Sequence, residues 1–150
     1  MQRGTHIAVG TNKGFVQLWD VERTKKIRQF GGHSARVGIV SMGFEQITFS
    51  GVLAWNLNTL TSGGRDRRIF HRDVRESSDY TSKLFGHTQE VCGLEWNPEG
   101  AQLASGGNDN QLLVWDVRNN QPTGTFKEHT AAVKAIAWSP HAVRSLRFYI

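Results

Sequence analysis

Three side chains in the second half of the chain are of the types that form a hydrolytic triad. His87, Ser105 and Asp109 could serve as base, nucleophile and orienting carboxylate. A serine nucleophile of that kind often lies in a strained Gly-x-Ser-x-Gly turn, whereas Ser105 lies in Ala-Ser-Gly-Gly. The local sequence therefore lacks the feature that would expose the hydroxyl for attack.

The same trio recurs earlier in the chain as His33, Ser62 and Asp66. A set of residues that returns with a repeat suits a structural motif, because an active site needs only one copy. Buried His, Ser and Asp side chains can join a Trp in one hydrogen-bond network, and buried polar groups need such partners. Trp115 completes the later set, but Arg72 stands at that place in the earlier one. We therefore predict a structural network and no enzyme.

The residues of both trios lie in segments that repeat along the chain. Three segments align without gaps: IAVGTNKGFVQLWDV at 7–21, LTSGGRDRRIFHRDV at 60–74 and LASGGNDNQLLVWDV at 103–117. Branched and aromatic residues flank turn-forming Gly, Asn and Asp, and no segment keeps a 3.6-residue apolar period. Each unit therefore predicts short β-strands. In the first unit, Val9 and Lys13 replace the Ser and Asp of the network.

The spacing of the repeat identifies its class. A phrase Val-x-x-[Leu/Ile]-x-Trp stands at 91–96 and 133–138, and His87 lies 42 residues before His129. A period of about 40–45 residues, with His early and Trp-Asp late, is typical of a WD40 blade of about four short strands. The sequence therefore predicts an all-β fold, a WD40 β-propeller fragment, in preference to a generic β-sandwich.

The repeat markers also predict the domain organisation. Residues 1–150 are expected to form a partial propeller, with about two full blades and parts of two others of an expected seven. The predicted units are the later part of one blade and the start of the next at 6–38, full blades at 52–86 and 87–128, and the first strand of another blade at 129–141. The tail at 142–150 does not continue the repeat, and we interpret it as a break in the reading frame.

Residues 39–51, IVSMGFEQITFSG, interrupt the repeat. Joining Val37 and Gly38 directly to Val52 restores the phrase Val-x-x-Leu-x-Trp-Asn, so these thirteen residues are surplus and fall inside a predicted strand. Interrupting a hydrogen-bonded strand leaves backbone groups that need new partners. We interpret the segment as foreign to the repeat, with a retained short intron or gene-model error as the leading hypothesis. The alternative is a real loop extruded from the strand.

Three long phrases resemble one family closely: HTQEVCGLEWNPEG at 87–100, LASGGNDNQLLVWD at 103–116 and HTAAVKAIAWSPH at 129–141. They are similar to the propeller of the Fizzy and Fizzy-related proteins, which are activators and substrate receptors of the anaphase-promoting complex. GTNKGFVQLWD and SGGRDR favour the Fizzy-related branch. The C-box and the Ile-Arg tail, the ligase-contact segments of that family, are not found in this sequence.

The resemblance implies a substrate-recognition and activator module of the anaphase-promoting complex ubiquitin ligase, which binds short degron peptides in cell-cycle control. Its partners would be that complex and degron-bearing substrates such as cyclins, in nucleus and cytoplasm. The alternatives are a generic WD40 protein-interaction scaffold and a non-functional truncated gene product. Which substrates it would take is left open.

The resemblance also assigns a site. It maps two residues that contact a Lys-Glu-Asn degron onto Asn108 and Asn110, which flank Asp109 in GGNDN. Amide side chains offer both donors and acceptors to such a peptide. We expect both amides to point outward while Asp109 points inward to His87. The alternative is that both asparagines only suit turn dihedral angles.

Composition argues against several other classes of function. The net charge is +5, but the basic residues are spread along the chain, so nucleic-acid binding is not expected. No run of about 18 apolar residues predicts a membrane span. The six histidines are too scattered for a metal site, and no cofactor is expected. The single cysteine, Cys92, is expected to be a small core residue and allows no disulfide framework.

Overall fold

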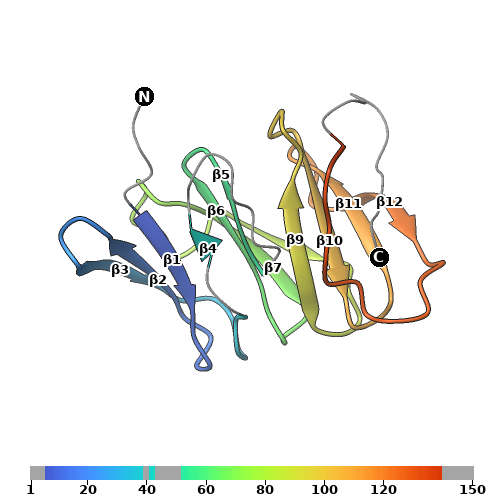
Figure 1. Cartoon of the computed structure of the whole chain (residues 1–150), viewed down its shortest axis with the longest axis horizontal. Coiled ribbons are helices and arrows are strands. Elements are labelled where there is room, and N and C mark those ends of the chain that lie inside the picture. The colour runs from blue at the N-terminus through green and yellow to red at the C-terminus, as the bar shows by residue number, and fades with distance from the viewer. Residues whose placement is uncertain (1–5, 39–40, 43–51, 140–150) are drawn as a thin grey trace.

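The computed structural model describes residues 6–38, 41–42 and 52–139, and within them every regular element is a β-strand. The strands form three four-stranded antiparallel sheets. Figure 1 shows the three sheets standing side by side along the long axis, in chain order from left to right. The predicted all-β fold is confirmed.

Each sheet is built largely from one predicted unit, with its strands ordered across it. The first sheet has the order β3-β2-β1-β4, the second β5-β6-β7-β8 and the third β12-β11-β10-β9. The bounds are β1 His6–Gly10, β2 Val16–Asp20, β3 Lys25–Phe30, β4 Ser41–Met42, β5 Leu53–Asn56, β6 Thr59–Gly63, β7 Arg68–Asp73, β8 Ser82–Phe85, β9 Val91–Trp96, β10 Gln102–Gly107, β11 Leu112–Asp116 and β12 Pro122–Phe126.

The middle strands of the third sheet are buried on both faces, because the second sheet covers one face and Val133 and Ile136 cover the other. In β10 and β11 almost every residue is buried, whereas at the outer edges β3 is largely exposed and β12 is partly exposed. Lys25 and Lys26 lie on β3, and charged edge residues of this kind discourage pairing with other chains.

Two apolar clusters join the sheets to one another. The cluster between the first and second sheets comprises Ala8, Val16, Leu18, Phe30, Val37, Val52, Leu53 and Leu60. The cluster between the second and third sheets comprises Ala54, Ile69, Leu84, Val91, Leu94, Trp96, Leu103, Leu113 and Trp115. Burying each large side chain contributes roughly 1.5–3 kcal/mol, so these clusters hold the sheets together.

One hydrogen bond recurs between each unit and the repeated phrase that follows it. The backbone N–H of Val91 donates to the carbonyl oxygen of Gly64 at 3.1 Å, and Val133 donates to Gly107 at 3.1 Å. At the equivalent place Val37 donates to Thr11 at 3.0 Å. The valine of the repeated phrase therefore sets the same approach of each unit to the one before it.

The ladder of the second sheet places the two ends of the surplus segment. Val37 bridges Gly64 and Leu53 pairs with Ser62, as Val91 pairs with Gly107 and Leu94 with Ser105 in the third sheet. The residues on either side of the thirteen therefore occupy successive positions of one interrupted strand. Their origin as a retained intron stays a hypothesis.

The segment itself does not stand apart from the fold. Ser41 and Met42 form β4, which pairs antiparallel with β1 of the first sheet. The remaining residues of the predicted insert, 39–40 and 43–51, lie outside the described residues, as does the predicted tail at 142–150. At least part of the segment thus belongs to a sheet, which neither a foreign insert nor an extruded loop would have required.

The predicted first strand of a further blade, at 129–141, is not a strand over its described part. Residues 131–139 carry no regular structure, although Val133 and Ile136 pack on the third sheet. A strand needs a ladder partner, and no described segment pairs with this one, so the assignment of 129–141 to a further blade stays a prediction. In the described part of the chain there is also no helix that could cross a membrane.

Candidate functional site

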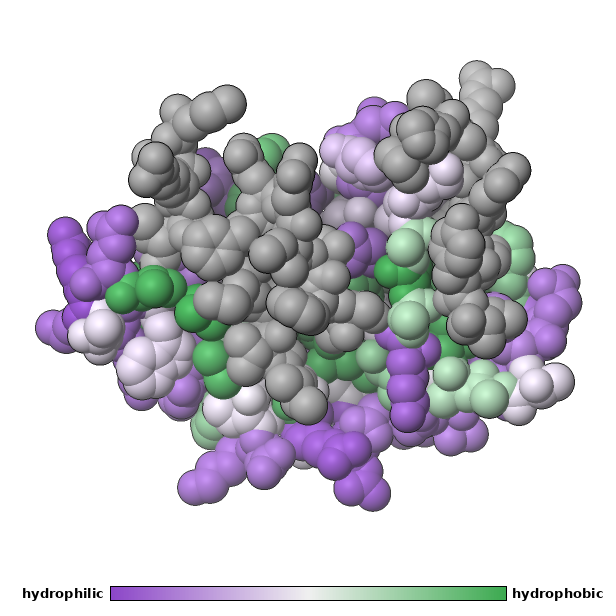
Figure 2. Space-filling view, viewed as in Figure 1, coloured by the Kyte–Doolittle hydropathy of each residue, from purple (hydrophilic) through white to green (hydrophobic). Residues whose placement is uncertain are grey.

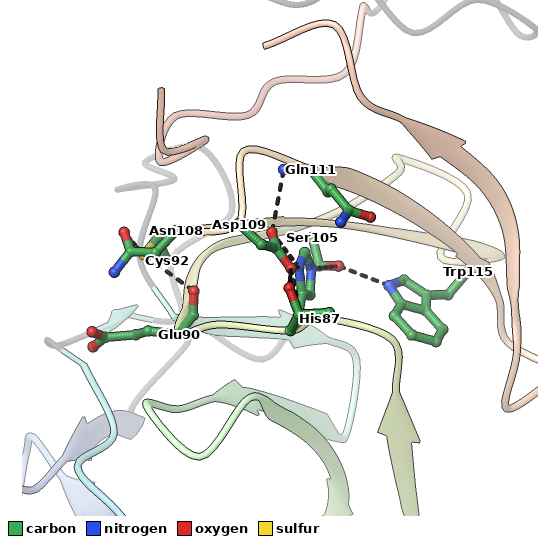
Figure 3. A network of polar contacts seen from close by, with 9 residues as sticks. His87, Glu90, Cys92, Ser105, Asn108, Asp109, Gln111 and Trp115 are labelled. Atoms are coloured by element: carbon green, nitrogen blue, oxygen red, sulfur yellow. Dashed lines mark hydrogen bonds and ion pairs between the residues drawn. The ribbon is translucent and has the colours of Figure 1, made fainter. Parts of the chain in front are cut away.

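The predicted network of the third sheet is a continuous relay of hydrogen bonds across two strands, β10 and β11, the loop before β9 and the β10–β11 turn. Trp115 Nε1 donates to Ser105 Oγ at 2.8 Å, and Ser105 Oγ lies 2.8 Å from His87 Nε2. His87 Nδ1 lies 3.1 Å from the Asp109 carboxylate. Figure 3 shows His87 between Ser105 and Asp109, with Trp115 at the far end.

The proton positions in this relay follow from the charges. Burial lowers the pKa of His87, which keeps the imidazole neutral at pH 7. The carboxylate accepts the Nδ1 proton, so Nε2 accepts the proton of the Ser105 hydroxyl, which in turn accepts from Trp115. Every donor in the relay therefore has an acceptor.

Asp109 also organises the turns around it. Its carboxylate accepts the backbone N–H groups of Thr88 at 2.7 Å and Gln111 at 3.2 Å. These contacts tie the segment before β9 to the β10–β11 turn. One carboxylate thus joins the histidine to two separate stretches of backbone.

The burial of the trio argues against hydrolysis. Ser105 is 0% exposed and His87 is 7% exposed, so neither reaches a surface where a substrate could approach. The Ser105 hydroxyl is held by the indole of Trp115 on its other side. The geometry fits a structural role for the relay, which holds the blade together and is called the histidine clamp below.

The second sheet repeats the relay with a different end group. His33 Nδ1 lies 2.9 Å from Asp66, and His33 Nε2 lies 2.8 Å from Ser62 Oγ. Arg72 Nη1 donates to Ser62 Oγ, and its Nη2 donates to the carbonyl oxygen of Gly31 at 2.9 Å. The Arg72 guanidinium therefore takes the place that the Trp115 indole has in the third sheet. The sequence alone shows only that the tryptophan is replaced.

Arg72 is an imperfect substitute for tryptophan. The residue is 0% exposed, and burial lowers its pKa to about 10. Its Nε has no hydrogen-bond partner among the described atoms. A buried cation with an unsatisfied donor lowers the stability of the fold, and an aromatic ring at the same position would avoid this loss.

Arg72→Trp is expected to stabilise a propeller that contains this sheet by about 1–2 kcal/mol. An indole can donate to Ser62 as Trp115 donates to Ser105, and Gly32 leaves the space that Gly86 leaves beside Trp115. Denaturant unfolding of the complete propeller measures the change. Arg72→Ala is the control and should destabilise, because it leaves a cavity beside Ser62. An unchanged or lower midpoint for Arg72→Trp would contradict the argument.

The first sheet lacks the relay, as the sequence predicts. Val9 and Lys13 occupy the places of the serine and the aspartate, and Trp19 Nε1 donates instead to Gln17 at 3.3 Å. Only the second and third sheets therefore carry the buried histidine clamp within the described residues.

The candidate degron residue Asn108 lies beside the clamp on the β10–β11 turn. Its backbone N–H donates to the carbonyl oxygen of Glu90 at 2.9 Å, and its Oδ1 accepts the thiol of Cys92 at 3.1 Å. Figure 3 shows its amide next to Cys92 and Glu90, on the other side of the turn from His87. Asp109 points inward and Asn108 points away from the relay. Cys92 is half-buried at this rim and is not the core residue that the sequence predicts.

Asn110 has a conformational reason for its identity. Its φ is 60°, in the left-handed region, where asparagine is tolerated better than most residues. Arg67 with φ 68° and Gly14 with φ 83° hold the equivalent positions in the other two units. The turn itself therefore demands this conformation, and the side chain of Asn110 remains available for another role.

Two further contacts near the site were not predicted from the sequence. Arg36 forms a bidentate ion pair with Glu90, with both N–O distances 3.1 Å, and joins the second and third units. Trp96 Nε1 donates to Thr61 Oγ1 at 3.2 Å, and Thr61 Oγ1 lies 2.7 Å from Nδ1 of the half-buried His71. Neither the ion pair nor this group of contacts recurs in every unit, so the repeat pattern in the sequence could not indicate them.

The repeated strands and their histidine clamps define a class, the WD40 repeat. Residues 78–116 and 120–145 match the family model described as "WD domain, G-beta repeat". A chain in the crystal structure of the mitotic checkpoint complex superposes with a TM-score of 0.81 at 44% identity, covering 91% of this chain and 38% of that one. The described sheets are therefore blades of a WD40 β-propeller.

Comparison with curated proteins shows which WD40 proteins this chain is similar to. The B-type cell cycle switch protein ccs52A of Medicago truncatula is 55% identical over 93% of this chain, and FIZZY-RELATED 1 of Arabidopsis thaliana is 52% identical over 93%. The anaphase-promoting complex subunit cdc20 of Dictyostelium discoideum is 49% identical over 91%. Over more than nine-tenths of its own length the chain is therefore similar to the WD40 propeller of the Fizzy and Fizzy-related proteins. It spans about a quarter of the length of these relatives, 26–27%.

Proposed function

We propose that this chain is part of a substrate-recognition and activator module of the anaphase-promoting complex, which binds short degron peptides in cell-cycle control. The observation that carries the proposal is identity of 49–55% over more than nine-tenths of the chain with relatives named as cell cycle switch proteins and as a subunit of that complex. The identity extends through the clamped blades, so the scaffold that presents the turns is shared.

In this proposal the propeller performs no chemistry. The names of these relatives denote cell-cycle proteins and a subunit of a complex, and none of them states a catalytic activity. The buried Ser105 supports the same conclusion. The module would raise the local concentration of a degron-bearing protein, such as a cyclin, at the ligase. It would work in the nucleus and the cytoplasm.

The degron contacts would come from Asn108 and Asn110. Both lie on the β10–β11 turn, which Asp109 holds rigidly through its bonds to the preceding loop. A rigid turn loses little freedom when it binds a peptide, so its amides can contribute to affinity. Asn108 already shares its Oδ1 with Cys92 and keeps its amide N–H₂ for a ligand.

The test is the affinity of a labelled Lys-Glu-Asn peptide for a complete propeller that carries these blades, measured by fluorescence anisotropy. Asn108→Ala is expected to weaken binding about 2- to 12-fold, the loss of one hydrogen bond of about 0.5–1.5 kcal/mol. Asn110→Gly should have a similar effect, because glycine keeps the positive φ and removes only the amide.

Cys92→Ala is the matched control, because it removes the contact of Asn108 with the thiol and leaves the amide in place. It should bind the peptide like the unmodified propeller. Unchanged affinity in both asparagine variants would remove these residues from the site. Failure of the unmodified propeller to bind any degron peptide would overturn the proposed function.

A further inference from the structure

The inner edge of the first sheet is formed in a different way from the other two. In the second and third sheets the innermost strand, β5 or β9, comes directly before the strand it pairs with. In the first sheet the strand on that edge of β1 is β4, which follows β3 in the chain. Figure 1 shows β4 beside β5, between the first and second sheets.

The position of β4 matches that of β9 in register and direction. Ile7 and Ala8 are equivalent to Leu103 and Ala104 in the gap-free alignment of their segments. Leu103 pairs with Trp96 and Ala104 with Glu95 in an antiparallel ladder. Ile7 pairs with Met42 and Ala8 with Ser41, also antiparallel.

The path of the chain allows this pairing. The N–H of Val37 bonds the carbonyl oxygen of Thr11, and a Cβ added to Gly10 would lie 2.3 Å from the carbonyl oxygen of Gly38. The chain therefore leaves the second sheet beside the end of β1. Three residues of extended chain reach roughly 10 Å, which is enough to pass from Gly38 to the place opposite Ala8.

The energetic reason is that β4 provides partners for the backbone groups on this edge of β1. An open strand edge presents unpaired N–H and C=O groups and invites pairing with other chains. Here β1 is central to the apolar cluster of the first sheet, with Ala8 0% exposed. A strand added to this edge satisfies its backbone groups.

We propose that β4, Ser41–Met42, serves as the inner strand of the first sheet and closes the edge of β1 that β9 closes on β10 in the third sheet. The first sheet thereby gains its fourth strand from a segment that follows β3 in the chain. This role does not depend on the proposed function, because it concerns only the edge of one sheet. It holds whatever the genetic origin of the thirteen residues.

The register of β4 can be tested by disulfide cross-linking in the full chain with Cys92→Ala. Two directly opposed pairs are made, Ile7→Cys with Met42→Cys and Ala8→Cys with Ser41→Cys, because opposed residues lie within disulfide range. Val9→Cys with Met42→Cys is the control, displaced by two residues. Mild oxidation is followed by mass spectrometry after trypsin, which leaves residues 4–13 and 37–65 as separate peptides.

Mixing isotope-labelled with unlabelled chain distinguishes links within one molecule from links between two, even in associated material. We expect at least one opposed pair to cross-link within the molecule several-fold more than the control. Equal yields in control and opposed pairs, or links only between molecules, would overturn the proposal.

Hydrogen exchange gives a second readout that does not need new cysteines. Ser41→Pro removes a backbone donor from β4 and should speed exchange in β1 several-fold, while β9–β12 keep their rates. The unchanged third sheet serves as the internal control for global unfolding. Unchanged exchange in β1 would contradict the proposed role of β4.

Discussion

Asp109→Ala should lower the free energy of unfolding of a complete propeller that contains the third sheet by about 3 kcal/mol. The substitution leaves the buried Nδ1–H of His87 without an acceptor and frees the backbone N–H groups of Thr88 and Gln111. Each buried donor without a partner destabilises by about 1–3 kcal/mol. Urea unfolding followed by circular dichroism measures the loss.

The chain provides both a matched and a parallel variant for this experiment. Lys13 holds the equivalent turn position in the first unit, which has no histidine clamp, so Lys13→Ala should change stability by less than about 0.5 kcal/mol. Asp66→Ala should resemble Asp109→Ala, because Asp66 accepts from His33 and from the backbone N–H of Ser34 at 3.0 Å. Equal losses for Lys13 and Asp109 would show that the clamp does not stabilise the blades.

The 150-residue chain, expressed by itself, should associate or aggregate instead of forming a monodisperse monomer. A closed ring leaves only short, protected edges, and three blades without a ring expose an outer face. On the third sheet, Phe126 and Trp138 are only partly covered and lie over a cluster of Ala104, Leu112, Val133 and Ile136. Figure 2 shows apolar residues reaching the surface over this sheet.

Sedimentation velocity and thermal unfolding would measure the association. We expect species larger than a monomer, or precipitation, and a broad thermal transition. Supplying the other blades of a relative's propeller should restore a monomer with a sharp transition, because the exposed face is then covered. A cooperative melt from a monodisperse 150-residue monomer would contradict this expectation.

Much of the fold could be predicted because it is encoded locally and repeatedly. Branched and aromatic residues between Gly-Asn-Asp turns indicate strands, and the aligned units place Ser105 and Ser62 at the same position in two sheets. Because the units repeat, each histidine lies beside the serine at the equivalent position of its own sheet. The relay of the third sheet therefore lies where the spacing of His87 and Asp109 indicates.

The side-chain partners of these residues were decided by the tertiary structure. The sequence shows that Arg72 replaces a tryptophan, but only the fold shows the guanidinium reaching both Ser62 and Gly31. The turn conformation at Asn110 and the bond between Asn108 and Cys92 are likewise visible only in three dimensions. Such contacts depend on the reach and direction of each side chain, which no residue spacing specifies.

The edges of the sheets depended on tertiary structure most of all. By itself the sequence determined the repeat, its strands and the position of the surplus segment between Gly38 and Val52. Only the tertiary structure decided that part of this segment would pair with β1, and that residues 131–139 would form no strand. The physical reason is that strand pairing needs a free edge within reach, and which edges are free is known only when the blades are assembled.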